Sequence, residues 1–98
     1  MVETGQYVSL KPGARIVSVR ESVQFSETIR RAIEEGSLWI NLDLSRTEEI
    51  SGSFAGFLAG IISRLHGMGG DLMITGANSS IQEVLKLVGF FDVIKVRV

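Results

Sequence analysis

The sequence contains no cysteine, and among its 98 residues only one is proline and one is histidine. Without cysteine, the chain can form no disulfide and offers no thiolate for catalysis or metal binding. The single histidine, His66, lacks the partners that a common zinc site requires. We therefore expect no metal and no cofactor.

The sequence also lacks a surplus of charge of either sign and a long apolar run. Ten Lys and Arg residues stand against eleven Asp and Glu residues, and no basic segment could neutralise a run of phosphates, so nucleic acid is not an expected partner. No stretch approaches the roughly 18 apolar residues of a membrane span, and the N-terminus lacks the apolar core of a secretory signal. These features predict a cytoplasmic protein.

What is present is the composition of an ordinary globular domain. Hydrophobic residues make up 45% of the chain and charged residues 21%. This composition and length predict one domain, covering residues 1–98, around a single core.

The order of apolar patterns predicts an α/β fold. Two β-branched stretches at 5–10 and 14–19 flank Lys11-Pro12-Gly13, which predicts an antiparallel hairpin. Apolar spacing then predicts helices over 24–35 and 53–67 and strands over 38–44 and 72–75. A third helix is expected to start with a capping box at Ser80–Glu83 and to end at Gly89, before a last strand within 92–98.

The predicted order is thus β-β-α-β-α-β-α-β. Strands that alternate with helices require crossover connections, so we expect a central, mostly parallel sheet of four to five strands covered by three to four helices. Gly56 and Gly60 fall inside the second helix, where we interpret them as points of close packing. The run Gly67–Gly70 follows a helix and precedes a strand, the wrong order for a phosphate loop.

The segment after the central strand is the best candidate for a functional site. It places the Ser53 hydroxyl in the first turn of the second helix, where free amides and the positive helix end favour an anion. A phosphate on Ser53 would add a charge of about −1.5 to −2 and could block a partner that accepts neutral serine. The alternative is that Ser51 or Ser53 only caps the helix.

The sequence resembles the STAS domain along residues 5–97. The resemblance is carried by a strand ending in Asp-Leu-Ser, a motif that starts a helix, a Gly-Gly turn followed by a short strand, and a helix ending in Leu-x-x-x-Gly. In this chain these are Ile40–Ser45, Ile50–Gly56, Gly69–Gly76 and Ile81–Phe90.

The resemblance implies a bacterial signalling protein that is not an enzyme. Stand-alone STAS domains are typically anti-sigma factor antagonists: the unmodified protein binds a serine-kinase anti-sigma factor, and phosphorylation of the motif serine, here Ser53, ends binding. The implied docking surface comprises Glu21, Ser22, Ser51, Gly52, Phe54 and Gly56.

The motif departs from the family pattern, and this leaves other functions open. Ser51 replaces an acidic residue, Gly52 a serine and Phe54 a glycine, while Val19-Arg20-Glu21-Ser22 replaces Gly-x-Leu-Asp. One alternative is an unphosphorylated STAS subunit of a larger complex, a stressosome-like scaffold or a lipid-transport ATPase, with Phe54 as an interface anchor. A small-molecule or nucleotide binder is a third possibility, and Trp39 with the terminal strand could support a weak homodimer.

Overall fold

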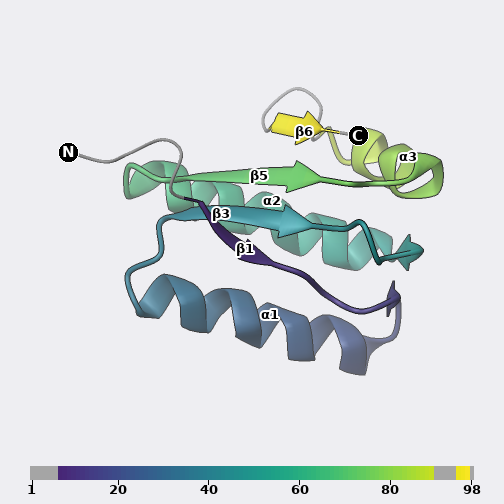
Figure 1. The fold of residues 1–98 in the computed structure, drawn as a ribbon, viewed down its shortest axis with the longest axis horizontal. Helices are drawn as coiled ribbons and strands as arrows, with labels where there is room; N and C mark the ends of the chain where they lie inside the picture. The colour runs from purple at the N-terminus through teal and green to yellow at the C-terminus, as the bar shows by residue number, and fades with distance from the viewer. Residues whose placement is uncertain (1–6, 90–94, 98) are drawn as a thin grey trace.

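The structure is a computed structural model that describes residues 7–89 and 95–97 (Figure 1). Its helices and strands, in chain order, are β1 (Val8–Leu10), β2 (Arg15–Ile16), α1 (Val19–Glu34), β3 (Trp39–Asp43), β4 (Glu49–Ile50), α2 (Gly52–Gly67), β5 (Asp71–Thr75), α3 (Ser79–Leu87) and β6 (Lys95–Arg97). The three helices and the parallel strands confirm the predicted α/β class.

The strands form two parallel sheets. The larger has the order β1-β3-β5-β6, and β2 and β4 form a separate pair. In the larger sheet Ser9, Asn41 and Met73 lie side by side in neighbouring strands. Each parallel pairing requires the chain to return to the same end of the sheet, and a helix makes each return.

One face of the larger sheet forms the core with the helices. Ile40 and Leu42 of β3 and Leu72 and Ile74 of β5 are wholly buried. They belong to a single apolar cluster that includes side chains of all three helices, and α2 passes behind β3 and β5 in Figure 1. Each buried side chain of this size stabilises the fold by about 1.5–3 kcal/mol, so this cluster fixes where the helix ends lie.

The opposite face of the sheet carries half-buried and largely polar side chains. The Asn41 amide donates to Ser9 Oγ (3.1 Å), and Thr75 Oγ1 donates to the Asn41 side-chain oxygen (3.2 Å). This ladder of hydrogen bonds crosses β1, β3 and β5 and helps to hold their register.

The predicted N-terminal hairpin is wrong. β1 pairs in parallel with β3, and β2 pairs in parallel with β4, so Lys11-Pro12-Gly13 leads from one sheet to the other. The Pro-Gly signal is local and marks a change of direction without choosing a partner strand. Pairing along the buried strand β3 brings Leu10 against the core, a gain that the turn sequence does not reveal.

Two helix starts also differ from prediction. α1 begins at Val19 rather than near residue 24, because Ser18 and Glu21 form a capping box: Ser18 Oγ accepts from the Glu21 amide (3.1 Å) and Glu21 Oε1 accepts from the Ser18 amide (2.9 Å). The extra turn was missed because its Val19 and Val23 side chains are exposed and break the apolar spacing.

The capping box predicted at Ser80–Glu83 is wrong as well. The N-cap of α3 is Asn78, whose side-chain oxygen accepts from the Ile81 amide (2.9 Å). The Asn78 side-chain nitrogen also donates to the Glu48 carbonyl (3.0 Å). This second bond ties the start of α3 to the loop before α2, which explains why asparagine rather than serine caps the helix.

Two strand predictions need adjustment. Between the predicted strand 38–44 and the predicted helix 53–67, where no strand was expected, the chain forms β4. Its two residues give little sequence signal, because only Ile50 is apolar and buried. The last predicted strand, within 92–98, is present as β6 at Lys95–Arg97; residues 92–94 and 98 lie outside the described part of the chain.

Candidate functional site

The two serines at the start of α2 are in different environments. Ser51 is the N-cap, and its Oγ accepts a hydrogen bond from the Phe54 amide (3.1 Å). Ser53 lies in the first turn, is exposed, and its Oγ is 3.1 Å from Ser51 Oγ. Of the two candidate capping residues, Ser51 therefore caps the helix, and Ser53 keeps a hydroxyl that solvent can reach.

The start of α2 is held in place from several sides. The Ser51 amide donates to the Ile16 carbonyl (2.9 Å) at the end of the β2–β4 pair. Just before β4, the buried Thr47 donates through Oγ1 to the Gly13 carbonyl (2.9 Å). Because the backbone leading into α2 is tied at two points to the segment 13–16, the first turn of α2 presents Ser53 from a fixed position.

The electrostatics of α2 favour an anion at this end. Its first turn contains no acidic residue, while its last turn contains Arg64 and His66. The unpaired amides of a helix N-terminus carry the equivalent of about half a positive charge. With no carboxylate in the turn to neutralise it, that partial charge would stabilise a phosphate on Ser53.

Phe54 does not lie where the predicted docking surface required it. Its side chain is wholly buried, and its ring packs between Phe25 (ring centroids 6.1 Å apart) and Phe57 (6.1 Å). Because Phe54 lies four residues before the buried Leu58, on the inner face of α2, it belongs to the core and is corrected from a docking residue to a packing residue. It also does not cover the neighbouring serine.

The glycines of α2 are on the outside of the helix. Gly52 and Gly56 are exposed, and so is Gly60. A β-carbon added at any of the three would meet no atom within 4 Å. The interpretation of Gly56 and Gly60 as points of close internal packing is therefore wrong, since nothing in the described part of the chain approaches them.

Glu21 and Ser22 lie in the first turn of α1. Glu21 Oε1 accepts from the amides of Ser18 and Val17 (2.9 Å each), and these bonds hold the pKa of its carboxyl below the ordinary value. Ser22 is half-buried, and within the described residues its Oγ has no hydrogen-bond partner. The predicted docking residues thus come from the N-terminal turns of two helices, with Phe25 of α1 touching Phe54 of α2 beneath them.

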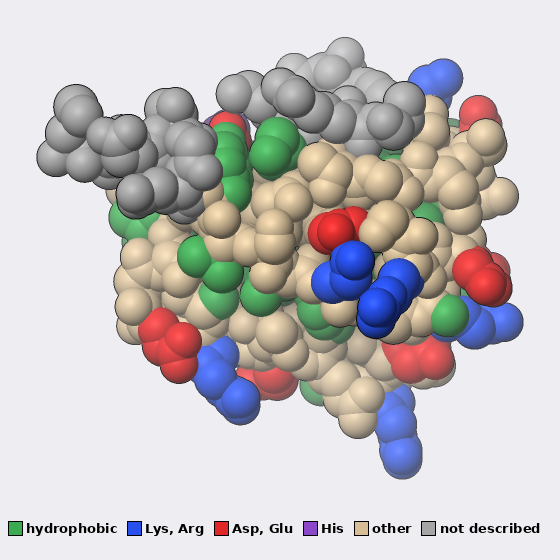
Figure 2. All heavy atoms as spheres, viewed as in Figure 1, with side chains coloured by type: hydrophobic (Ala, Val, Ile, Leu, Met, Phe, Trp, Pro, Cys, Tyr) green, Lys and Arg blue, Asp and Glu red, His purple; other side chains and the backbone are tan. Residues whose placement is uncertain are grey.

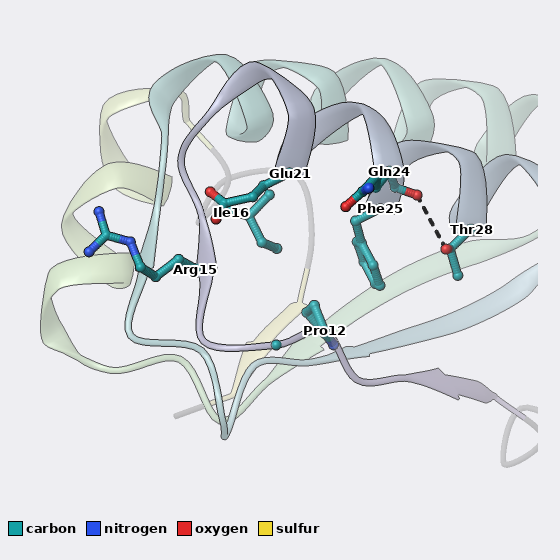
Figure 3. Close-up of a pocket in the computed structure, with 8 residues that line it drawn as sticks. Pro12, Arg15, Ile16, Glu21, Gln24, Phe25 and Thr28 are labelled. Carbon is teal, nitrogen blue, oxygen red and sulfur yellow. Dashed lines mark hydrogen bonds between the residues drawn. The ribbon is translucent and has the colours of Figure 1, made fainter.

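A cavity of about 280 Å³ opens beside α1 and was not predicted (Figure 3). It lies between α1 and the chain from Pro12 to Ile16, and its lining comprises Pro12, Gly13, Arg15, Ile16, Glu21, Gln24, Phe25 and Thr28. The capping box at Ser18 and Glu21 is the sequence signal that could have pointed to it, since an earlier start of α1 brings Glu21 and Gln24 over the Pro12 turn.

Some charged groups elsewhere lie in ion pairs. Asp43 Oδ2 lies 3.6 Å from Lys11 Nζ, and hydrogen bonds from Ser45 keep the pKa of the Asp43 carboxyl below its ordinary value. His66 Nε2 lies 3.0 Å from Asp71 Oδ1. On the face shown in Figure 2, basic side chains lie next to acidic ones. Among residues 7–89 and 95–97, no three His, Asp or Glu side chains gather closely enough to hold a metal ion.

A membrane span is not found among the described helices: none is both long and apolar enough to cross a bilayer. The longest, α1 and α2, have 16 residues each, fewer than the roughly 20 that a transmembrane helix needs.

Solved structures with the same fold include those of two proteins of low sequence identity to this chain. The solution structure of the protein TM1081 has a TM-score of 0.78 and 22% identity, covering 98% of this chain and 75% of that one. A crystal structure of TM1081 from Thermotoga maritima, a candidate anti-sigma factor antagonist, has a TM-score of 0.80 at 18% identity, covering 95% and 83%. The anti-sigma factor antagonist SpoIIAA in its unphosphorylated form has a TM-score of 0.71 at 16% identity, covering 100% and 83%.

No curated protein sequence matches the chain. The model of the STAS domain family, however, matches residues 14–98. That match covers α1, α2 and α3 and every strand except β1. Together with the parallel sheet and the three helices described above, it shows that this chain belongs to the STAS domain family.

Proposed function

We propose that the protein is an anti-sigma factor antagonist that binds a serine-kinase anti-sigma factor and is released from it when Ser53 is phosphorylated. The observation that carries this proposal is the exposed Ser53 hydroxyl at the positive end of α2, beside a serine that already caps the helix. The fold shared with SpoIIAA and the match to the STAS family support the same function. In this role the protein binds and is modified, and catalyses no reaction itself.

The docking surface in this proposal is made of small and polar groups around Ser53. Gly52 and Gly56 are exposed, and Ser51, Glu21 and Ser22 are partly exposed. A partner that touches these residues would lie directly over Ser53. With a doubly charged phosphate there, the partner would have to bury the charge or give up its contacts around Ser53. Either change would weaken binding several-fold.

Binding with variants at position 53 tests this proposal. The tagged protein is used to recover partners from cells of its source organism, and mass spectrometry identifies any kinase-type anti-sigma factor. We expect wild type and Ser53→Ala to recover it and Ser53→Asp to recover at least about tenfold less. Equal recovery by wild type and Ser53→Asp would show that a negative charge at residue 53 does not control partner binding.

The chain offers a matched control in α3. Ser80 is exposed and occupies the second helical position after its N-cap, as Ser53 does in α2. Ser80→Asp places the same charge at an equivalent helix end and should leave recovery unchanged. A loss with Ser80→Asp as large as with Ser53→Asp would indicate a general effect of charge rather than a site on α2.

The alternative of an unphosphorylated subunit in a larger complex depended on Phe54 as an exposed anchor. The ring of Phe54 is inside the core between two other phenylalanines, so the residue that favoured this alternative does not support it.

A further inference from the structure

The cavity beside α1 is large enough for one long side chain. Its volume of about 280 Å³ is just below the range of about 300–1,000 Å³ found for pockets that hold drug-sized ligands. Glu21 lines this cavity and also belongs to the docking surface around Ser53. A partner seated on that surface could therefore reach it.

The cavity wall is mixed: Pro12, Ile16 and Phe25 supply its apolar side chains, beside the polar or charged side chains of Arg15, Glu21, Gln24 and Thr28. Ile16 is 2% exposed, Pro12 is buried, and Phe25 is half-buried. In Figure 3 the Phe25 ring points down from α1 toward Pro12, and Ile16 enters from the opposite side. The apolar part of the wall suits an aliphatic stem, because burying methylene groups against apolar surface lowers the free energy.

The mouth of the cavity carries an anion in a fixed position. Glu21 Oε1 is held by the amides of Val17 and Ser18, and the same bonds keep the pKa of this carboxyl below its ordinary value, so it is ionised at neutral pH. Among the described residues Glu21 is in no ion pair. Arg15 also lines the cavity and its charge helps to lower the pKa of the Glu21 carboxyl, but its guanidinium pairs with Glu49 (3.4 Å). Figure 3 shows the Arg15 side chain pointing away from Phe25, and Lys11 pairs with Asp43 (3.6 Å).

We propose that this cavity receives an arginine side chain of the protein partner, with its stem between Ile16 and Phe25 and its guanidinium beside Glu21. This inference rests on the proposed function and extends the docking surface along α1. Arginine fits better than lysine because its planar head can lie on the Phe25 ring while it donates to the Glu21 carboxylate and the Gln24 side-chain oxygen. An acidic side chain would meet Glu21 and be repelled.

A titration with a minimal ligand tests the site without the partner. N-acetyl-arginine amide is added to the ¹⁵N-labelled protein, and its neutral isostere, N-acetyl-citrulline amide, serves as the matched ligand. We expect saturable shifts of the Ile16, Gln24 and Phe25 amide signals with the arginine compound and binding at least about threefold weaker with the citrulline compound. Absence of saturable shifts at these residues, or equal binding of both compounds, would overturn the proposal.

A pair of variants on α1 makes the test specific. Glu21→Gln removes the charge but keeps a side chain that can complete a capping box, and it should weaken binding of the arginine compound by at least about threefold. Glu27→Gln removes a carboxylate from the same helix outside the cavity, where it pairs with Arg30, and should change nothing. Equal affinity of wild type and Glu21→Gln would refute the role of Glu21.

The two proposals fail in different ways. If Ser53→Asp abolishes partner recovery but the arginine compound does not bind, the proposed function is supported and the arginine site is refuted. If the arginine compound binds as expected but wild type recovers no kinase-type anti-sigma factor, the cavity is supported as a cation-binding site. The proposal of a kinase-type anti-sigma factor as the partner is then refuted.

Discussion

At the scale of single residues, the serines at the start of α2 have separable roles because only Ser51 caps the helix. Replacing Ser51 by alanine leaves the Phe54 amide without its partner, and we expect the free energy of unfolding to fall by about 1 kcal/mol. Ser53→Ala should cost less than about 0.5 kcal/mol, as expected at an exposed surface position. Urea denaturation measures both, and a larger loss for Ser53→Ala would reverse the assignment of the cap.

Two glycines should respond to alanine in opposite directions. A β-carbon at the buried Gly70 would lie 2.0 Å from the Leu38 carbonyl oxygen, so Gly70→Ala must displace backbone and should lower the free energy of unfolding by about 2 kcal/mol or more. Gly56 is exposed in the interior of α2 with open space around it, so Gly56→Ala should raise that free energy by about 0.5–1 kcal/mol. Thermal denaturation provides the comparison, and stabilisation by Gly70→Ala would contradict the close approach.

At the scale of elements, the start of α1 should depend on pH through Glu21. Since hydrogen bonds from the Ser18 and Val17 amides lower the pKa of Glu21 in the folded state, its contribution to stability is fully present above the ordinary pKa of 4.5 and is lost as the pH falls through the folded value. The stability difference between wild type and Glu21→Gln should therefore shrink as the pH is lowered from 7 to 3. A difference that is independent of pH would contradict this assignment.

Elements were predictable where their apolar side chains repeat and less so where polar contacts define them. The spacing of apolar residues located α2, β3 and β5 within one or two residues, because their inner faces are wholly apolar. The starts of α1 and α3 depend on Ser18 and Asn78, and the latter also bonds to a loop distant in the sequence. A contact between segments so far apart in the chain cannot be predicted from the local sequence around either of them.

The candidate site was likewise predictable in some features and not in others. The position of Ser53 in the first turn of α2 followed from a helix start that the sequence marked clearly. That Phe54 points inward and Gly56 outward depends on the rotation of α2 against the sheet. The cavity beside α1 was predictable only in part: the Ser18–Glu21 capping box marks the true start of α1 in the sequence, but the path of the chain through Pro12 depends on the fold.

At the scale of the whole molecule, the core extends without a break from Ile16 to Leu85. We therefore expect residues 1–98 to unfold as one unit. The fluorescence of Trp39, the single tryptophan, and far-ultraviolet circular dichroism should give the same midpoint in urea. Midpoints that differ between the two probes would indicate more than one cooperative unit.

The absence of a hairpin among residues 7–89 and 95–97 has a consequence for how the chain reaches this structure. In every described strand pairing a whole helix separates the two partners along the chain. None of these four pairings can thus form between neighbouring segments, and each one must overcome the entropy of closing a long loop. Helical turns can form within microseconds, whereas the sheet must await collapse, so this small protein should fold far more slowly than a helical bundle of equal length.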